Sequence, residues 1–304
     1  MREKALITGA FGFIGRYTAL EYYKRGYNVI GIGHGGWNET EYNKWGISEF
    51  YDLDITIENL LKMSEKFNVI VHCAGSASVA RSFQNPIQDF ERTVITTLNL
   101  LEYIKNYSID SKLVYLSSAA VYGESDENVL VENMVLNPIS PYGLHKKIAE
   151  EICEDYSKNY GLNIVILRLF SVYGEGLKKQ LLWDACNKIS TNKNIFWGSG
   201  DETRDWINIK DLVKFIFFSS NYADETCAVY NIGTGHGISV KEILGIVFKY
   251  FNINEVPQFN GMKDNGNPLR YVANIEKIKK WNIDLKYGIE EGIKEYVQWF
   301  KNKQ

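Results

Sequence analysis

The stretch KALITGAFGFIG at residues 4–15 decides the fold. Residues 4–8 form a short, mostly apolar run, and Gly9, Gly12 and Gly15 follow at the spacing of a tight turn that opens a helix. The first glycine permits the turn, the second lets backbone amides approach a pyrophosphate, and the third allows close helix–strand packing. Because a helix N-terminus stabilises a bound anion, this stretch predicts a dinucleotide-binding strand–turn–helix unit.

The first half of the chain repeats this alternation of strand and helix. Short apolar runs, which are typical of strands buried on both faces, lie at 28–32, 69–72, 113–117 and 164–168. Helical patterns lie between them at 13–25, 57–66, 86–106 and 142–160. Such alternation requires crossover connections, and it predicts an α/β fold with a Rossmann-type, doubly wound parallel sheet.

The pattern changes after residue 175, where shorter pieces predict a smaller, discontinuous C-terminal lobe that binds substrate. We expect helices near 178–190, 210–220, 239–250 and 288–301, and strands at 194–197, 205–208 and 229–232. The run 205–208 and the strand 229–232 are interpreted as a return to the large sheet. The predicted dinucleotide-binding domain is therefore 1–175 with 205–235, and the predicted lobe is 176–204 with 236–304.

Composition excludes several classes of protein. The chain has 304 residues, with 34 basic and 37 acidic side chains and a formal net charge of -3, so it offers no general attraction to nucleic acid or anionic lipid. No apolar run is long enough for a transmembrane helix, and the charged start of the chain does not resemble a signal peptide. Four scattered cysteines favour a reduced, cytoplasmic compartment, and neither they nor the histidines suggest a metal site.

Three side chains predict the chemistry. Ser118 follows the strand at 113–117, while Tyr142 and Lys146 lie four residues apart and therefore on one face of the next helix. A free phenol has a pKa near 10, but a nearby ammonium and the positive ring of an oxidised nicotinamide would lower it. Tyr142 is then a usable proton shuttle, and Ser118 can hold the reacting oxygen beside it.

The end of the second strand bears on the choice of cofactor. A carboxylate normally stands there to bind the ribose 2′-hydroxyl, but this strand runs into Gly33-His34-Gly35-Gly36. The missing acid leaves room for a 2′-phosphate, so we expect NADP(H) in preference to NAD(H). His34 is either a phosphate contact or a solvated loop histidine, and Glu39 or Glu41 could fold back and reverse the preference.

Taken together, these motifs resemble the extended short-chain dehydrogenase/reductases of the nucleotide-sugar epimerase/dehydratase type. The resemblance covers nearly the whole chain and includes the glycine motif, His72-Cys-Ala-Gly75, Tyr142 with Lys146, and two longer stretches. These stretches are Ser117 to Gly123 and Arg168 to Gly174. The motifs are specific for the family and do not identify one substrate.

The resemblance implies a role for each matching residue. The catalytic residues would be Ser118, Tyr142 and Lys146. The cofactor would be bound by Gly9, Phe11, Gly12, Phe13, Ile14, Gly15, His34, Asp54, Ile55, Cys73, Ala74, Gly75, Ser117, Tyr142 and Lys146. The nucleotide-diphosphate sugar would be bound by Ser78, Arg81, Ser118, Ser171, Arg204 and Arg270. Arg204 is the expected diphosphate ligand, and Arg270 is a candidate substitute for an arginine that relatives carry where this chain has Lys263-Asp264-Asn265.

The reaction follows from two departures from the family pattern. Relatives that dehydrate sugars carry an Asp-Glu pair where this chain has Ala119 and Ala120, so dehydration is not expected. The missing acid near Gly33 favours NADPH and hence net reduction. We therefore expect a reductase of a 4-keto-6-deoxy-sugar nucleotide, with a nucleotide-sugar 4-epimerase that retains NAD as the alternative. A non-catalytic dinucleotide-binding sensor is a remote alternative, since Ser118, Tyr142 and Lys146 are all present.

Relatives commonly dimerise through the helices that correspond to 86–106 and 142–160. The resemblance therefore implies a homodimer, and no nucleic-acid or membrane partner is expected. The candidate contact face comprises Leu98, Leu101, Ile104, Ile148, Ile152 and Tyr156. The same side chains could instead pack on the sheet.

Overall fold

The computed structural model describes residues 2–63, 66–125, 127–222, 227–262, 266 and 268–303. Contacts within the chain divide it into two compact units, each built from three segments. Unit 1 comprises Met1–Gly123, Val135–Leu169 and Val213–Tyr230, and unit 2 comprises Glu124–Met134, Phe170–Leu212 and Asn231–Gln304.

Unit 1 is built on a sheet of 7 strands in the order β10-β6-β5-β4-β1-β2-β3. The strands are β1 (Lys4–Thr8), β2 (Asn28–Gly33), β3 (Ile47–Asp52), β4 (Val69–His72), β5 (Lys112–Ser118), β6 (Ile164–Leu169) and β10 (Ala228–Ile232). The five pairings from β3 across to β6 are all parallel. The carboxyl ends of these strands consequently meet at one edge of the sheet, where ligands of such folds bind.

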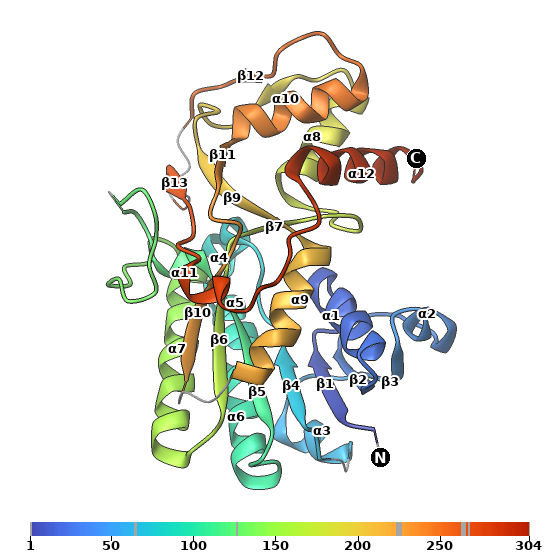
Figure 1. Cartoon of the computed structure of the whole chain (residues 1–304), viewed down its shortest axis with the longest axis vertical. Coiled ribbons are helices and arrows are strands. Elements are labelled where there is room, and N and C mark those ends of the chain that lie inside the picture. The colour runs from blue at the N-terminus through green and yellow to red at the C-terminus, as the bar shows by residue number, and fades with distance from the viewer. Residues whose placement is uncertain are drawn as a thin grey trace. The chain divides into compact units, whose positions relative to one another are not determined.

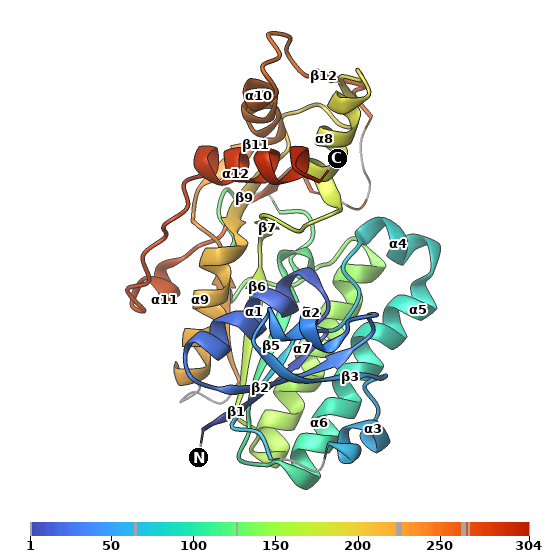
Figure 2. The ribbon, with the colours of Figure 1, turned by 90° about the vertical axis from the view of Figure 1, so that its right-hand side faces the viewer.

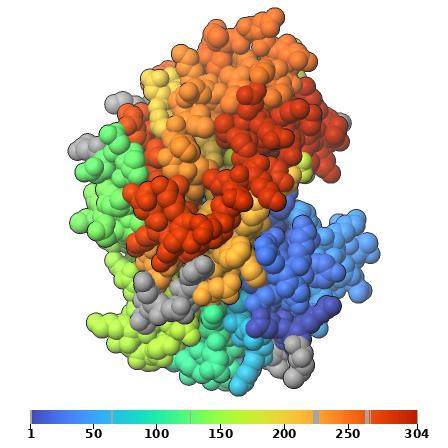
Figure 3. All heavy atoms as spheres, in the orientation of Figure 1, coloured from blue at the N-terminus to red at the C-terminus, as the bar shows by residue number. Residues whose placement is uncertain are grey.

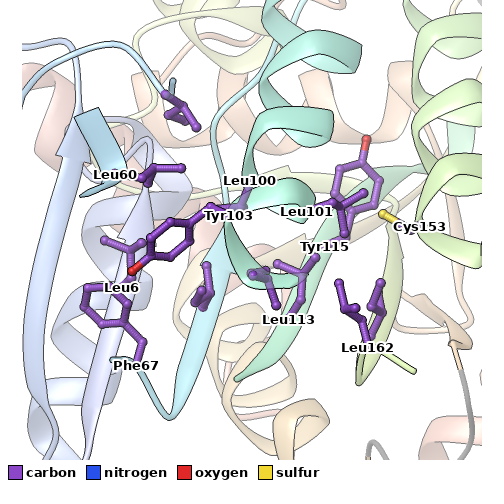
Figure 4. Close-up of a cluster of buried hydrophobic side chains, with 14 of the residues drawn as sticks. Leu6, Leu60, Phe67, Leu100, Leu101, Tyr103, Leu113, Tyr115, Cys153 and Leu162 are labelled. Atoms are coloured by element: carbon purple, nitrogen blue, oxygen red, sulfur yellow. The ribbon is translucent and has the colours of Figure 1, made fainter. Parts of the chain in front are cut away.

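Helices cover both faces of this sheet (Figures 1 and 2). They are α1 (Phe13–Lys24), α3 (Ile57–Lys62), α6 (Thr96–Tyr107), α7 (Pro141–Tyr160) and the second half of α9 (Ile209–Ser219). The same unit contains three further short helices, α2 (Glu39–Asn43), α4 (Val79–Gln84) and α5 (Pro86–Phe90). On one face, Tyr22 of α1 and Phe217 of α9 place their rings 5.1 Å apart. On the other, α3, α6 and α7 enclose a buried hydrophobic cluster with Leu6, Tyr115 and other strand residues (Figure 4). The parallel Rossmann-type sheet predicted from the alternating pattern is thus confirmed.

Most residues of the candidate dimer face lie in or against the hydrophobic core of unit 1. Leu101, Ile104 and Tyr156 belong to the buried cluster beneath α6 and α7, and Leu98 and Ile152 pack against that cluster. Packing on the sheet, which was the other interpretation of these residues, is thus observed for five of the six, and the dimer stays a prediction.

Several features of unit 1 differ from the prediction, and they include the unpredicted short helices α2 and α4. β3 was not predicted, because only Ile47 of its six residues is fully buried and the strand lies at the edge of the sheet. The single helix expected at 86–106 is α5, a π-helical segment at Glu91–Ile95, and α6. The short helix α2, all of which is described, has no buried residue and lies at the surface, among the blue atoms of Figure 3.

Unit 2 contains small sheets and helices. Its strands are β7 (Ser171–Tyr173), β8 (Ile195–Phe196), β9 (Thr203–Asn208), β11 (Gly237–Ser239), β12 (Gln258–Phe259) and β13 (Arg270–Tyr271). Its helices are α8 (Gln180–Ser190), α10 (Val240–Phe251), α11 (Glu276–Lys279), α12 (Ile289–Lys301) and the first turn of α9.

The expectation that 205–208 returns to the large sheet is wrong. β9 pairs instead with β7, β11 and β13 in a sheet of 4 strands. The physical reason is that β9 is only partly buried and carries Arg204, whereas strands inside the large sheet are covered on both faces. The strand expected at 229–232 does join the large sheet, as β10.

Candidate active site

The glycine turn between β1 and α1 has the geometry of an anion site. Gly9 has φ +63°, and a Cβ there would lie 2.8 Å from the backbone of Ala74. A Cβ on Gly15 would lie 2.2 Å from the carbonyl oxygen of Gly9, so α1 can approach this turn only with glycine at that position. Among the described residues no side chain caps the N-terminus of α1, and its first turn holds no acidic residue. The open amide groups fit the pyrophosphate of a dinucleotide.

Aromatic rings surround this turn on the side of β2. The ring of Phe11 lies 4.8 Å from that of Trp37, and a Cβ on Gly35 would collide with Phe11. The Arg16 guanidinium stands 5.2 Å from the Trp37 ring and donates to the carbonyl oxygens of Gly12 and Phe11. Phe13 packs on Tyr17 within α1. Arg16 thereby occupies two loop carbonyl groups, while the amides of Gly9 and Gly12 close the turn by donating to the carbonyl oxygens of Ile32 and Gly9. The amides that fit a ligand are those of the uncapped first turn of α1.

Two carboxylates occupy the region where the sequence suggested room for a 2′-phosphate. β3 aligns Asp52 with Gly33, the last residue of β2. His34 contacts both acids, with Nε2 2.7 Å from Asp54 Oδ1 and Nδ1 3.3 Å from Asp52 Oδ1. The hydrogen bond with Asp54 is the main cause that raises the pKa of His34. Glu41 does not fold back, because it closes the capping box of α2 with Asn38.

Asp52 was missed because β3 itself was missed. A missing acid at the end of β2 was the only argument for NADP(H), and the structure places two acids, Asp52 and Asp54, beside His34 at that end. The next predicted residue, Ile55, is buried, and its carbonyl oxygen accepts a hydrogen bond from Asn99 Nδ2 at 3.0 Å.

Buried hydrogen bonds fix the segment after β4, which contains Cys73, Ala74 and Gly75. The Ala74 amide donates to Thr8 Oγ1 at 3.1 Å, and this hydroxyl lies 2.7 Å from Nδ1 of His72. Burial and the charge of Lys146 lower the pKa of His72 to about 3, so the ring is neutral. Burial raises the pKa of the Cys73 thiol to about 12, which excludes a thiolate at neutral pH. His72 and Cys73 are therefore both neutral at this pH.

The three predicted catalytic side chains all lie at the carboxyl end of β5. Ser118 ends β5, and its Oγ accepts from the Ala120 amide at 3.2 Å, so its own hydrogen remains available for donation. Tyr142 lies in the first turn of α7, which begins at the N-cap Ser140, and its amide donates to Ser82 Oγ at 3.1 Å. Lys146 is buried and donates to the Leu116 carbonyl oxygen at 2.7 Å. The structure therefore brings the serine, tyrosine and lysine together in unit 1.

The proton affinities that the polypeptide itself gives these groups differ from the expectation. Burial raises the pKa of Tyr142, and its hydrogen bond with Ser118 only partly offsets this. Burial lowers the pKa of Lys146 to about 8, although Glu150 and Asp89 act in the opposite direction. The expected lowering of the Tyr142 pKa is thus not a property of the polypeptide alone. A further positive charge is required, and an oxidised nicotinamide ring would supply one.

Two buried charged residues beside this group were not predicted. Glu150 lies one turn after Lys146 on α7, and it pairs with Arg168 of β6 through an Nη2–Oε2 contact of 2.7 Å. The Ser117 hydroxyl donates to Glu150 Oε1, so the Ser117 side chain is engaged within the protein, and its expected cofactor contact stays a prediction. The spacing Tyr142, Lys146, Glu150 on one helix face was the available signal.

Two of the predicted substrate residues also belong to unit 1. Ser78 is the N-cap of α4, and its hydroxyl accepts from the Arg81 amide at 3.3 Å. Arg81 itself is exposed on the first turn of that helix. The amide of Ser76 donates to Thr93 Oγ1 at 3.3 Å, which ties the start of this loop to the π-helical segment.

The other three predicted substrate residues lie in unit 2. Ser171 begins β7, and Arg204 lies in β9, where its guanidinium donates to the carbonyl oxygens of Thr203 and Leu269. Paired residues share a face of a sheet, and here Arg204 pairs with Tyr271 while Arg270 pairs with Thr203. The two side chains therefore leave the sheet on opposite faces, and the Arg270 guanidinium donates to Asn128 Oδ1, while its substrate contact stays a prediction. Residues 263–265 lie outside the described residues.

The described residues contain no cluster of three or more histidine, cysteine or acidic side chains able to hold a metal ion. Within the same ranges no helix has the length and apolarity needed to cross a membrane.

Comparison with known proteins extends these observations to the whole chain. The model of the NAD dependent epimerase/dehydratase family matches residues 5–233. A Methanocaldococcus jannaschii protein named "Putative UDP-glucose 4-epimerase" is 33% identical over 311 residues, which cover 98% of each chain. UDP-glucuronate 4-epimerase of Thermodesulfobacterium geofontis is 30% identical over 312 residues, or 97% of this chain and 95% of that one.

Solved structures resemble the fold over the same extent. The UDP-glucuronic acid 4-epimerase of Bacillus cereus, in complex with UDP-glucuronic acid and NAD, has a TM-score of 0.86 and 26% identity. The match covers 99% of this chain and 100% of that one. The similarity therefore includes both units and is not restricted to the nucleotide-binding motif.

Proposed function

This chain is an enzyme of the NAD-dependent epimerase/dehydratase family, and from that premise we propose that it is a UDP-sugar 4-epimerase that retains NAD. The observation that carries the proposal is the full-length similarity to proteins named as UDP-sugar 4-epimerases, combined with an intact Ser118, Tyr142 and Lys146 group. The structural relative from Bacillus cereus binds both UDP-glucuronic acid and NAD.

The carboxylates near the ribose position support NAD over NADP. The argument for a reductase depended on an absent acid at the end of β2, but Asp52 and Asp54 both approach His34 at that place. A 2′-phosphate there would meet two negative charges, while a ribose hydroxyl would find hydrogen-bond acceptors. Net reduction by NADPH thus loses its main support, and the epimerase alternative is the better interpretation.

The chain's own residues account for the proton steps. Tyr142, as phenolate, would take the proton from the sugar 4-hydroxyl, and the Ser118 hydroxyl would donate a hydrogen bond to the same oxygen. The Lys146 ammonium would stabilise the phenolate. NAD supplies the reversible acceptor for the hydride of C4. After the keto sugar turns, Tyr142 would return the proton to the oxygen of the opposite epimer.

The residues after Ser118 are consistent with this choice. Ala119 and Ala120 form the start of a short 3₁₀ turn and offer no acid to protonate a departing hydroxide. A dehydratase needs such a group, whereas a 4-epimerase does not lose water.

The test is a direct assay of epimerisation without added cofactor. UDP-glucose, UDP-N-acetylglucosamine and UDP-glucuronic acid are incubated separately with the purified protein and followed by proton NMR. We expect one of them to yield its C4 epimer, and denaturation to release NAD from the protein. An enzyme that converts none of these sugars, but consumes NADPH with a 4-keto-sugar nucleotide, would establish the reductase instead.

We further propose that the protein is a homodimer, as the family resemblance implies. Light scattering coupled to size-exclusion chromatography tests this. A mass corresponding to one chain of 34.9 kDa across the concentration range would refute it.

A further inference from the structure

A buried ion pair holds both ends of the segment that carries Ser118. At the start of this segment, the Ser117 hydroxyl donates to Glu150 Oε1. At its end, the Tyr122 hydroxyl accepts from Arg168 Nη1 at 3.0 Å. Arg168 also donates to Glu150, from Nε to both carboxylate oxygens at 3.1 Å and from Nη2 to Oε2 at 2.7 Å. Ser118 therefore lies between Ser117 and Tyr122, and the ion pair of Glu150 and Arg168 binds the hydroxyl groups of both.

We propose that Glu150 and Arg168 are positioning residues that hold the catalytic serine segment, residues 117–122, against the helix that carries Tyr142. This inference rests on the proposed function, because it assumes that Ser118 and Tyr142 act on one substrate oxygen. It assigns no chemical step to either residue. Both act through the hydroxyl groups of Ser117 and Tyr122.

The placement of the pair on α7 supports this role. Tyr142, Lys146 and Glu150 follow one another at intervals of four residues and share a face of the helix. Lys146 donates to the carbonyl oxygen of Leu116, the residue that precedes Ser117. The end of β5 is therefore tied to α7 at two successive turns, and the first turn of the same helix presents Tyr142.

Energetics also favour positioning over simple stabilisation. Glu150 and Arg168 are only 1% and 3% exposed, so both charges have left water almost completely. A buried ion pair rarely exceeds the stability of well-packed apolar side chains of similar volume. Apolar side chains could not hold two hydroxyl groups, however, whereas this pair has donors and acceptors directed at both.

The experiment removes one attachment point at a time and leaves the ion pair intact. Ser117→Ala deletes the hydroxyl bound to Glu150, and Tyr122→Phe deletes the hydroxyl bound to Arg168. The matched control is Ser111→Ala, because Ser111 is buried immediately before the opposite end of β5 and donates to the Phe67 carbonyl oxygen at 2.5 Å. Each variant loses one buried hydroxyl, so the comparison separates loss of stability from loss of position.

Steady-state epimerisation gives the first readout. We expect kcat to fall about tenfold in Ser117→Ala and Tyr122→Phe, because small displacements of a catalytic group are costly, while KM and NAD affinity stay within about twofold. Ser111→Ala should keep the wild-type kcat despite a similar loss of stability. Unchanged kcat in both segment variants, or an equal loss in Ser111→Ala, would overturn the proposal.

Hydrogen exchange of the cofactor-free protein gives a second readout that needs no substrate. Mass spectrometry should detect faster exchange of the amides of 118–122 in Ser117→Ala and Tyr122→Phe, and wild-type exchange there in Ser111→Ala. Faster exchange in a protein that epimerises no UDP-sugar would refute the proposed function while supporting the positioning role. Unchanged exchange in both segment variants would refute the positioning role whatever the substrate.

Discussion

Burial raises the pKa of Tyr142 and outweighs its hydrogen bond with Ser118. If this phenol moves the proton, Tyr142→Phe should lower turnover by about a hundredfold or more, the usual contribution of a general acid or base. NAD content after purification should remain near that of the wild type, since the phenol ring is retained. Turnover close to the wild-type rate would show that another group carries the proton.

Lys146 gives a prediction about stability and pH. Its folded-state pKa of about 8 lies below its ordinary value of 10.5. The buried ammonium therefore lowers the free energy of unfolding, and this cost has its full size below pH 8. That cost disappears as pH rises from 8 towards 10.5, because in this interval Lys146 is neutral in the folded chain but still protonated in the unfolded chain.

Denaturant unfolding of the cofactor-free wild type and Lys146→Met at pH 7.5 and 9.5 checks this prediction. Relative to the variant, the wild type should gain about 2 kcal/mol in free energy of unfolding over that interval. Parallel pH profiles for the two proteins would contradict the lowered pKa.

Among single residues, those that belong to a local sequence motif were predicted, and those whose place depends on long-range contacts were missed. Ser118, Tyr142 and Lys146 were recognisable because their order and spacing are local. Asp52 was not, because it reaches the site through the pairing of β3 with β2. Glu150 and Arg168 were not, because nothing in a helix or strand pattern indicates that two charges are buried together.

Among the elements, two helices allow a matched test of what their glycines do. A Cβ on Gly15 of α1 would lie 2.9 Å from the Cα of Ala10 and closer still to the Gly9 oxygen, and backbone atoms cannot easily move away. A Cβ on Gly245, exposed in α10, meets nothing within 4 Å.

We therefore expect the same substitution to have opposite effects. Gly15→Ala should lower the free energy of unfolding by about 1–3 kcal/mol and weaken NAD binding, because overpacking displaces the turn. Gly245→Ala should raise the free energy of unfolding by about 0.5–1 kcal/mol, since alanine is the better helix former. Thermal unfolding of both variants distinguishes the effects, and stabilisation by Gly15→Ala would contradict the packing argument.

The strands whose place in the large sheet was predicted correctly have nearly uniform burial along the sequence. β1, β4 and β6 are short apolar runs that need no knowledge of their neighbours. The edge strand β3 and the strand β9 mix buried and exposed positions, so their sheets are determined by partners distant in the sequence. The interruption of 86–106 by a π-helical segment likewise leaves no mark in the hydrophobic pattern.

For the whole molecule, binding of the cofactor should raise the free energy of unfolding. A ligand present at 100 times its Kd raises the free energy of unfolding by about 2.7 kcal/mol. After removal of any retained nucleotide, NAD at a saturating concentration should raise Tm by several degrees, and the same concentration of NADP should raise it less. An equal or larger shift with NADP would show that Asp52 and Asp54 do not control the preference.

The three-segment construction of unit 1 has a consequence for synthesis of the protein. The sheet ends in β10, whose residues 228–232 leave the ribosome long after β1 to β6. At about 5–20 residues per second, the interval between β6 and β10 lasts several seconds, and during it the edge of β6 has no neighbour. Nascent chains stalled in this interval should be prone to aggregation, and they should become soluble once translation passes residue 232.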